Sequence, residues 1–243
     1  MSRIQAVCFD LDDTLRDPGG ARGAIRRTCE RLGPLIQVDP ARLFAANGEV
    51  WQRLWPEVED GWTHGFMTGE AVTTEAWRRT LQACGHHDPA TARRAAKIHL
   101  KHAFTAHRLF DDARILLDAI EPDLGLAVVT NGASDTQRGV LRALGIEGRF
   151  HAVIVSGEVG VAKPDPAVFE LALDVLDVPA DHAWHVGDNV LTDVAGARAA
   201  GLTAVWLNRD GATPPAGAEK PDLVVSSLTE FGRHVSAALA GEP

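Results

Sequence analysis

The sequence has few cysteines and no long apolar segment. Its 243 residues include only Cys8, Cys29 and Cys84, an odd number with apolar neighbours, so we expect reduced core thiols and no disulfide framework. No apolar run approaches the ~20 residues needed to cross a bilayer. Asp10 also interrupts the N-terminal segment before a signal-length stretch is complete. These absences predict a soluble, cytoplasmic protein that has no membrane partner.

A long basic run is also missing. The 24 lysines and arginines face 33 aspartates and glutamates, which gives a formal charge of −9. This excess of negative charge disfavours binding to a phosphate backbone, so we expect no nucleic-acid partner. Hydrophobic residues make up 45% of the chain, which is ample for a packed core. The length fits one large α/β domain or a domain that carries an insertion.

A short apolar run followed by carboxylates opens the chain. Residues 6–9 read Ala-Val-Cys-Phe, as in a strand buried on both faces of a parallel sheet. Asp10, Asp12 and Asp13 follow directly, where a core could not hold them unpaired. Taken alone, they could start a solvated loop, one of them capping a helix. Later segments favour a cleft instead.

Between residues 22 and 104 the patterns are helical. Ile25, Cys29, Leu32 and Ile36 form an amphipathic stripe, and Asp39-Pro40 and Asp88-Pro89 are typical helix starts. We expect at least four helices and no strand here. From residue 110 helices alternate with apolar strands. The expected strands are 126–129, 152–155, 183–186, 203–207 and 223–225.

Alternating strands and helices predict parallel pairing with right-handed crossovers. We therefore expect an α/β fold, with a doubly wound, Rossmann-like parallel sheet and an inserted all-helical cap. The core domain would comprise residues 1–15 and 108–243, and the cap residues 16–107.

The carboxyl ends of parallel strands share one edge of the sheet, where ligands bind. Polar residues at these ends should therefore meet: Asp10, Asp12, Thr130, Asn131, Lys163, Asp188 and Asp193. Several close carboxylates repel one another, at about 4 kcal/mol for each close pair at an effective dielectric constant of ~20. A divalent cation would relieve this repulsion, and oxygen ligands suit Mg²⁺. The hydroxyl, amide and lysine opposite would then seat a phosphoryl group.

Four segments resemble, in order, the motifs of the haloacid dehalogenase superfamily. They are Asp10-x-Asp12-x-Thr14, Thr130-Asn131-Gly132, Lys163-Pro164 and Gly187-Asp188-x-x-x-x-Asp193. The resemblance covers residues 1–15 and about 108–243, and the helical insert stands where that superfamily carries a cap. One such motif would be weak, but four in register are specific.

The resemblance implies a role for each of these residues. Asp10 would be the nucleophile that forms an aspartyl-phosphate, and Asp12 would protonate the leaving group and then activate water. Asp10 and Asp188 would bind Mg²⁺ by side chain, and Asp12 through its carbonyl. Thr130, Asn131 and Lys163 would bind the phosphoryl group. Thr14 and Asp193 would orient these ligands without binding the ion or the phosphoryl group themselves.

The implied function is a Mg²⁺-dependent phosphomonoester hydrolase acting on a small soluble metabolite, as a monomer or homodimer. Asp12 favours phosphoryl transfer, because halide removal at carbon does not need an acid two residues after the nucleophile. Asp13 departs from the glycine that many phosphatases have there. The alternatives are a phosphomutase or a haloacid dehalogenase of the same superfamily, or a receiver-like phosphoacceptor domain.

Weaker signals lie in the insert. We expect Trp51, Trp55, Trp62 and Trp77 to be core residues rather than a stacking surface for substrate. A loop at residues 60–65 is the expected substrate-facing lid. His99 and His102 have the i, i+3 spacing of metal ligands, but no third ligand is indicated, so we expect a solvated face.

Overall fold

A computed structural model of the chain describes residues 4–120 and 122–241. Its contacts define two compact units. The core unit comprises Met1–Asp17, Leu109–Asn131 and Gly145–Pro243, and the helical unit comprises Pro18–Arg108 and Gly132–Leu144. The domain boundaries proposed from the sequence stay a prediction.

The core unit is built on a six-stranded parallel sheet in the order β5-β4-β1-β6-β7-β8. The strands are β1 (Ala6–Phe9), β4 (Gly125–Thr130), β5 (Ala152–Val155), β6 (Ala183–Gly187), β7 (Thr203–Leu207) and β8 (Leu223–Val225). Apolar side chains fill both faces of the central strands, as the continuous apolar runs predict. The predicted fold class, a doubly wound parallel sheet with an additional helical part, is confirmed.

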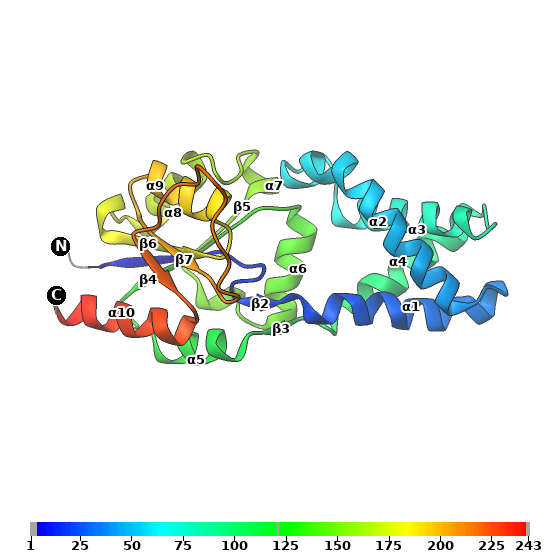
Figure 1. Cartoon of the computed structure of the whole chain (residues 1–243), viewed down its shortest axis with the longest axis horizontal. Coiled ribbons are helices and arrows are strands. Elements are labelled where there is room, and N and C mark those ends of the chain that lie inside the picture. The colour runs from blue at the N-terminus through cyan, green and yellow to red at the C-terminus, as the bar shows by residue number, and fades with distance from the viewer. Residues whose placement is uncertain (1–3, 121, 242–243) are drawn as a thin grey trace. The chain divides into compact units, whose positions relative to one another are not determined.

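Helices cover both faces of this sheet (Figure 1). On one face lie α8 (Ala167–Leu176), the π-helical turn η4 (Val190–Val194) and α9 (Ala195–Ala199), which pack through residues such as Phe169 and Val194. On the other lie α5 (Asp111–Ala119) and α10 (Leu228–Ala240), and Phe231 of α10 meets Phe9 edge to face at 6.1 Å. The shorter elements of the chain are β2 (Arg16–Asp17), β3 (Arg108–Leu109), α7 (Ser156–Val159), η1 (Pro18–Gly20), η2 (Glu147–Arg149) and η3 (Ala180–His182).

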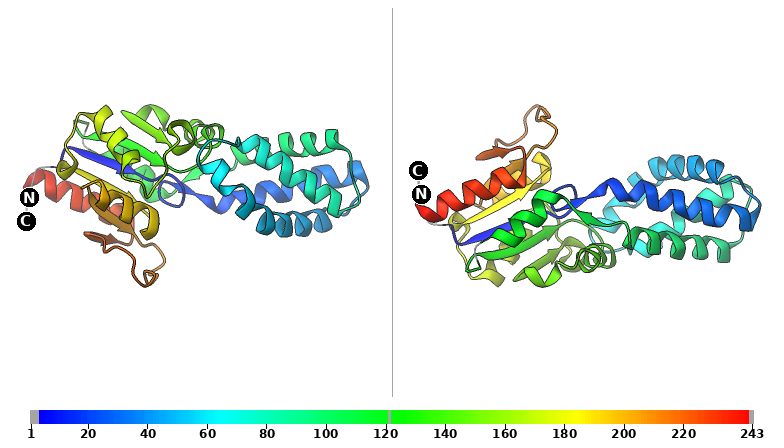
Figure 2. Two further views of the ribbon diagram at one scale, coloured as in Figure 1. Left: turned by 90° about the horizontal axis from the view of Figure 1, so that it is seen from above. Right: turned by 90° about the horizontal axis from the view of Figure 1, so that it is seen from below.

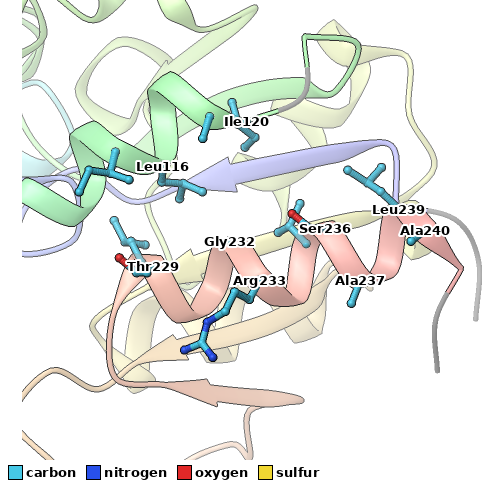
Figure 3. A pocket seen from close by; sticks show the side chains of 13 residues that line it. Leu116, Ile120, Thr229, Gly232, Arg233, Ser236, Ala237, Leu239 and Ala240 are labelled. Atoms are coloured by element: carbon cyan, nitrogen blue, oxygen red, sulfur yellow. The ribbon is translucent and has the colours of Figure 1, made fainter.

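A surface groove of about 520 Å³ runs between α5 and α10 (Figure 3). Apolar side chains such as Leu116, Ile120 and Leu239 line it. None of the strand-end polar residues lines this groove.

The helical unit holds α1 (Ala21–Ile36), α2 (Pro40–Thr63), α3 (Gly69–Ala83), α4 (Pro89–Phe104) and α6 (Ser134–Leu144). Figure 2 shows α1 to α4 as an antiparallel bundle. The carboxylates of Asp39 and Asp88 accept hydrogen bonds from the first backbone N–H groups of α2 and α4, which confirms both helix starts. Asp135 of α6 caps α3 in the same way, through the N–H groups of Gly69 and Glu70. No helix in the described ranges is long and apolar enough to span a membrane.

Two expectations for the helical unit were wrong. Residues 60–63 are the last turn of α2 and not part of a loop, because the helix continues to Thr63. His99 and His102 are half-buried rather than solvated, since each ring has a partner. The Trp77 indole donates to His99 Nδ1 (3.1 Å), and His102 Nδ1 lies 3.2 Å from the Thr28 hydroxyl. The tryptophans pack as expected: Trp77 is fully buried, and the other three pack against a buried cluster around Leu54.

Candidate active site

The parallel register of the core unit brings the ends of β1, β4 and β6 together. Phe9, the last residue of β1, pairs with Val128 on one side and with Val186 on the other. The backbone N–H of Asp10 donates to Val186 O (3.0 Å), so the sheet ladder fixes the residue that follows the strand. The side chains that leave these strands therefore share one edge of the sheet.

Lys163 joins two of the predicted acidic residues. Its Nζ lies 2.6 Å from Asp10 Oδ1 and 2.6 Å from Asp193 Oδ1, and all three side chains are at least nine-tenths buried. Burial disfavours the charged ammonium, but Asp10 and Asp193 outweigh burial and raise the pKa of Lys163 above its usual value. Lys163 therefore carries a positive charge inside the protein.

Asp193 has partners on both carboxylate oxygens. Oδ1 also accepts from Nε2 of His185 (3.0 Å), and Oδ2 accepts from the backbone N–H of Asn189 (3.0 Å). Burial opposes its ionisation, yet Lys163 and His185 hold the pKa of Asp193 below its usual range. The turn η4 presents this carboxylate against Gly187, where an added Cβ would lie 2.2 Å from Asp193 Cγ, so only glycine fits.

Asp188 completes a group of three carboxylates. Ligand oxygens of Asp10, Asp188 and Asp193 all lie within 4.8 Å of one another, and among the described residues these three form the one acidic or His/Cys group with metal-ligand spacing. Asp188 is partly exposed and has no salt bridge with a described residue. The indole of Trp206 donates to its backbone carbonyl (2.9 Å), which fixes the main chain there.

The charge balance of this group fits a cation. Burial raises the pKa of Asp10 to about 8, with Lys163 opposing the shift and Asp193 and Asp188 adding to it. Burial likewise raises the pKa of Asp188 to about 7, and the charge of Asp193 adds to the shift. One ammonium cannot balance three buried or half-buried carboxylates. A divalent cation between Asp10 and Asp188 would supply the missing charge, and oxygen donors suit Mg²⁺.

The loop after β1 is held tightly. Asp12 Oδ1 accepts from Arg16 Nε (2.6 Å), and the backbone N–H groups of Leu15 and Arg16 both donate to Leu11 O (3.0 and 2.8 Å). Asp13 has a φ of +60°, which places it in the left-handed region. Glycine accepts this region without cost and aspartate tolerates it better than most residues, which explains why Asp13 can stand in this turn.

Arg209, which follows β7, also holds the loop after β1 in place. It donates to both carboxylate oxygens of Asp112 (2.8 and 3.1 Å) and to the backbone carbonyl of Thr14 (3.1 Å). Its guanidinium also lies 4.0 Å from the ring centroid of Phe110. Thr14 itself is fully buried. Arg209 thereby ties the loop that carries Asp10 and Asp12 to the start of α5.

Asn131 aligns the loop that carries Lys163. Its side-chain Nδ2 donates to Lys163 O (2.9 Å), and its Oδ1 accepts from the Lys163 N–H (2.9 Å). This reciprocal pair links the end of β4 to the Lys163 segment. Thr130 is the buried last residue of β4.

Three residues with contacts at this edge were not recognised in the sequence. Arg16 was assigned no role from the sequence, and Arg209 lies 195 residues from the carbonyl that it binds. His185 lies within a strand that was interpreted as apolar, and it is buried at 1% exposure. A polar ring inside an otherwise apolar strand needs a partner, and that signal could have identified His185.

Comparison with known proteins supports the class of this site. Residues 4–201 match the family model described as haloacid dehalogenase-like hydrolase. The chain is 39% identical to a phosphoserine phosphatase of Thermus thermophilus, over 93% of this chain and 97% of that protein. Because the family model covers most of the sequence, the chain belongs to the haloacid dehalogenase-like hydrolases. It is an enzyme of the hydrolase class.

Solved structures of related proteins share the fold. A 2-haloacid dehalogenase from Pseudomonas syringae pv. Tomato DC3000 is 28% identical, with a TM-score of 0.70 over 96% of this chain and 98% of that chain. YfnB of Bacillus subtilis, a hydrolase of the same superfamily whose structure is described as bound to magnesium, is 25% identical. Its TM-score is 0.70 over 96% of this chain and 99% of that chain. The relatives thus include both phosphatases and dehalogenases.

Proposed function

We propose that this chain is a Mg²⁺-dependent phosphomonoester hydrolase that works through an aspartyl-phosphate on Asp10. The observation that carries the proposal is the proximity of Asp10 to both Lys163, at 2.6 Å, and Asp188, with ligand oxygens within 4.8 Å. A second carboxylate follows two residues further along at Asp12. A nucleophilic carboxylate, a fixed cation and a separate acid/base group are what transfer of a phosphoryl group to and from an enzyme requires.

Asp10 and Asp188 would hold the Mg²⁺ by side chain, and Asp12 would hold it by its carbonyl. When bound, the ion would neutralise phosphate charge and orient the phosphoryl group. Asp193 would orient Lys163 rather than bind the ion directly, because both of its oxygens already accept hydrogen bonds from Lys163, His185 and the Asn189 N–H.

The reaction would proceed in two displacements. A carboxylate oxygen of Asp10 attacks phosphorus, and the bond to the leaving oxygen breaks as Asp12 donates a proton to it. Water then attacks phosphorus while Asp12 accepts a proton from that water. The bond between phosphorus and Asp10 breaks, and Asp10 is released as a carboxylate. Lys163 opposes the effect of burial on the pKa of Asp10, and together with the bound cation it would keep Asp10 charged for attack. Its ammonium would also neutralise the transferring group. The Thr130 hydroxyl would donate a hydrogen bond to a phosphoryl oxygen. Asn131 would donate through the second hydrogen of its Nδ2, because the first is bonded to Lys163 O.

The substrate that we propose is a small phosphate ester. O-Phosphoserine is a rational first compound because a phosphoserine phosphatase is 39% identical to this chain. The test is phosphate release from an aryl phosphate and from a panel of phosphorylated metabolites, with Asp10→Asn as the blank. Release that requires Mg²⁺ and is lost in Asp10→Asn supports the proposal, whereas no release from folded protein at any divalent-ion concentration contradicts it.

A dehalogenase is the second candidate, because a 2-haloacid dehalogenase is among the structures that share the fold. In that reaction the Asp10 carboxylate would attack carbon and displace halide, so Asp12 would have no proton to donate. Chloride release from 2-chloropropionate measures this activity. If Asp12→Asn lowers phosphate release strongly and no chloride is released, the phosphatase proposal stands.

A further inference from the structure

The helical unit carries a basic groove that the proposed reaction does not use. It lies between α1 and α4 and has a volume of about 450 Å³. We call it the α1–α4 groove and define it by six lining residues: Arg31, Arg93, Arg94, Lys97, Lys101 and His102. A cluster of five permanent cations is unusual in a chain whose formal charge is −9.

The spacing along α4 concentrates the charge on one side of the helix. Arg93, Lys97 and Lys101 follow one another at i, i+4 and i+8, so they lie in a row about 12 Å long at 1.5 Å per residue. Like charges at i, i+4 destabilise a helix by a few tenths of a kcal/mol for each pair. The row is therefore unfavourable for folding by itself.

The groove cations have no acidic partners among the residues that the structure describes. Other arginines of the same unit do: Arg53 pairs with Glu49, and Arg79 pairs with Glu57 and Glu75. The arginines that precede Arg31 on α1 are also engaged. Arg22 and Arg26 lie over the ring of Phe44, and Arg27 donates to His102 O (3.3 Å).

His102 of α4 contacts α1, and its pKa responds to the positive charges around it. The Thr28 hydroxyl donates to Ala24 O (2.8 Å), so its oxygen is left to accept from His102 Nδ1. Burial lowers the pKa of His102, and the charges of Arg27, Arg31 and Lys101 lower it further. Cations from both helices therefore act on the same point.

We propose that the α1–α4 groove binds a compact anion that carries several phosphate groups, such as a triphosphate. Guanidinium forks and ammonium groups are the side chains that recognise phosphate. The volume lies in the range of small-ligand pockets, and the row of charges is short. A long polyanion would also meet the net negative charge of the rest of the chain.

The test is calorimetric titration of the full-length protein with inorganic triphosphate in the presence of EDTA. Binding of one triphosphate per chain is expected, weakened at least about tenfold by Lys97→Gln/Lys101→Gln, which removes two charge-assisted contacts. Arg53→Gln is the matched control, since it removes a cation of the same unit outside the groove, and it should leave the affinity unchanged within about twofold.

Thermal melting separates this role from a structural one. Without ligand, Lys97→Gln/Lys101→Gln should melt at or above the wild-type temperature, because repulsion along α4 is relieved. Triphosphate should raise the melting temperature of the wild type but not that of the double variant. The proposal is overturned if no heat is detected, or if the double variant binds as tightly as the wild type. Tighter binding of single-stranded RNA than of triphosphate, or a groove-dependent change of oligomeric state without triphosphate binding, would also overturn it.

Discussion

Lys163 Nζ lies 2.6 Å from Asp10 Oδ1, although 153 residues separate the two along the chain. Both side chains are almost completely buried, and the same ammonium also contacts Asp193. Removing one partner of a buried ion pair leaves an uncompensated charge, which typically costs about 3–5 kcal/mol. We therefore expect the loss of Lys163 to destabilise the fold as well as to disrupt the proposed site.

Lys163→Met should lower the free energy of unfolding by about 3–5 kcal/mol at neutral pH, because Asp10 and Asp193 lose their shared cation. Adding Asp10→Asn should restore part of this loss, since one of the two stranded carboxylates becomes neutral. Urea denaturation of the two single variants and the double variant measures the coupling. Strictly additive effects would contradict a direct interaction.

His185→Leu should lower kcat about 10- to 100-fold and change KM little, because the histidine orients Asp193 and does not reach the substrate. The ring also packs on Phe169 with centroids 4.8 Å apart, so leucine retains part of the contact. His185→Gln keeps a side-chain donor and should recover part of kcat. If Gln and Leu give the same kcat, the hydrogen bond to Asp193 is not the reason for the loss.

Asp13 tests the geometry of the turn after β1. With φ at +60°, Asp13→Val should lower the free energy of unfolding by about 1–2 kcal/mol, because a β-branched residue is strained in this region. Asp13→Gly removes the strain and should not destabilise the protein by more than about 0.5 kcal/mol. Asp13→Asn controls for charge, since asparagine also adopts this conformation. Equal losses for Val and Asn would indicate that charge rather than conformation matters.

We expect His99 to make the helical unit sensitive to acid. Burial lowers its pKa from 6.5 to about 4, so the unfolded chain binds a proton between these values and the folded protein does not. Stability should therefore fall as the pH decreases from about 6.5 to 4, by at most about 1.4 kcal/mol per pH unit. His99→Gln keeps an acceptor for the Trp77 indole and should flatten this part of the profile. Denaturation followed by tryptophan fluorescence at several pH values measures the slope.

Local patterns in the sequence were sufficient to predict the six strands, the helix starts after Asp39 and Asp88, and the parallel sheet. Parallel pairing then implied that residues at strand ends meet, and Asp10, Lys163 and Asp193 do so. Contacts that depend on tertiary structure could not be predicted. The pairing of Arg209 with Asp112, and of His185 with Asp193, joins residues whose spacing along the chain carries no periodic signal.

The side-chain roles differ in how far the sequence could assign them. Phosphate binding by Asn131 stays a prediction, whereas the two hydrogen bonds between its amide and the backbone of Lys163 are a contact that only the folded chain reveals. The last turn of α2 was missed because Gly61 and its polar neighbours are typical of a loop. In the structure, an added Cβ at Gly61 would lie 3.2 Å from Met67 Cγ, so glycine lets Met67 approach the helix closely. Such errors arise where tertiary contacts outweigh local preference.

The most direct measurement is phosphate release from an aryl phosphate by the wild type, Asp10→Asn and Asp188→Asn, each with excess Mg²⁺ and with EDTA. If Asp10 is the nucleophile and shares a cation with Asp188, the wild type should turn over with Mg²⁺ but not with EDTA, and Asp10→Asn should turn over under neither condition. Asp188→Asn should need far more Mg²⁺ than the wild type for any activity. Turnover by Asp10→Asn at the wild-type rate, or wild-type turnover that EDTA leaves unchanged, would contradict the proposed mechanism.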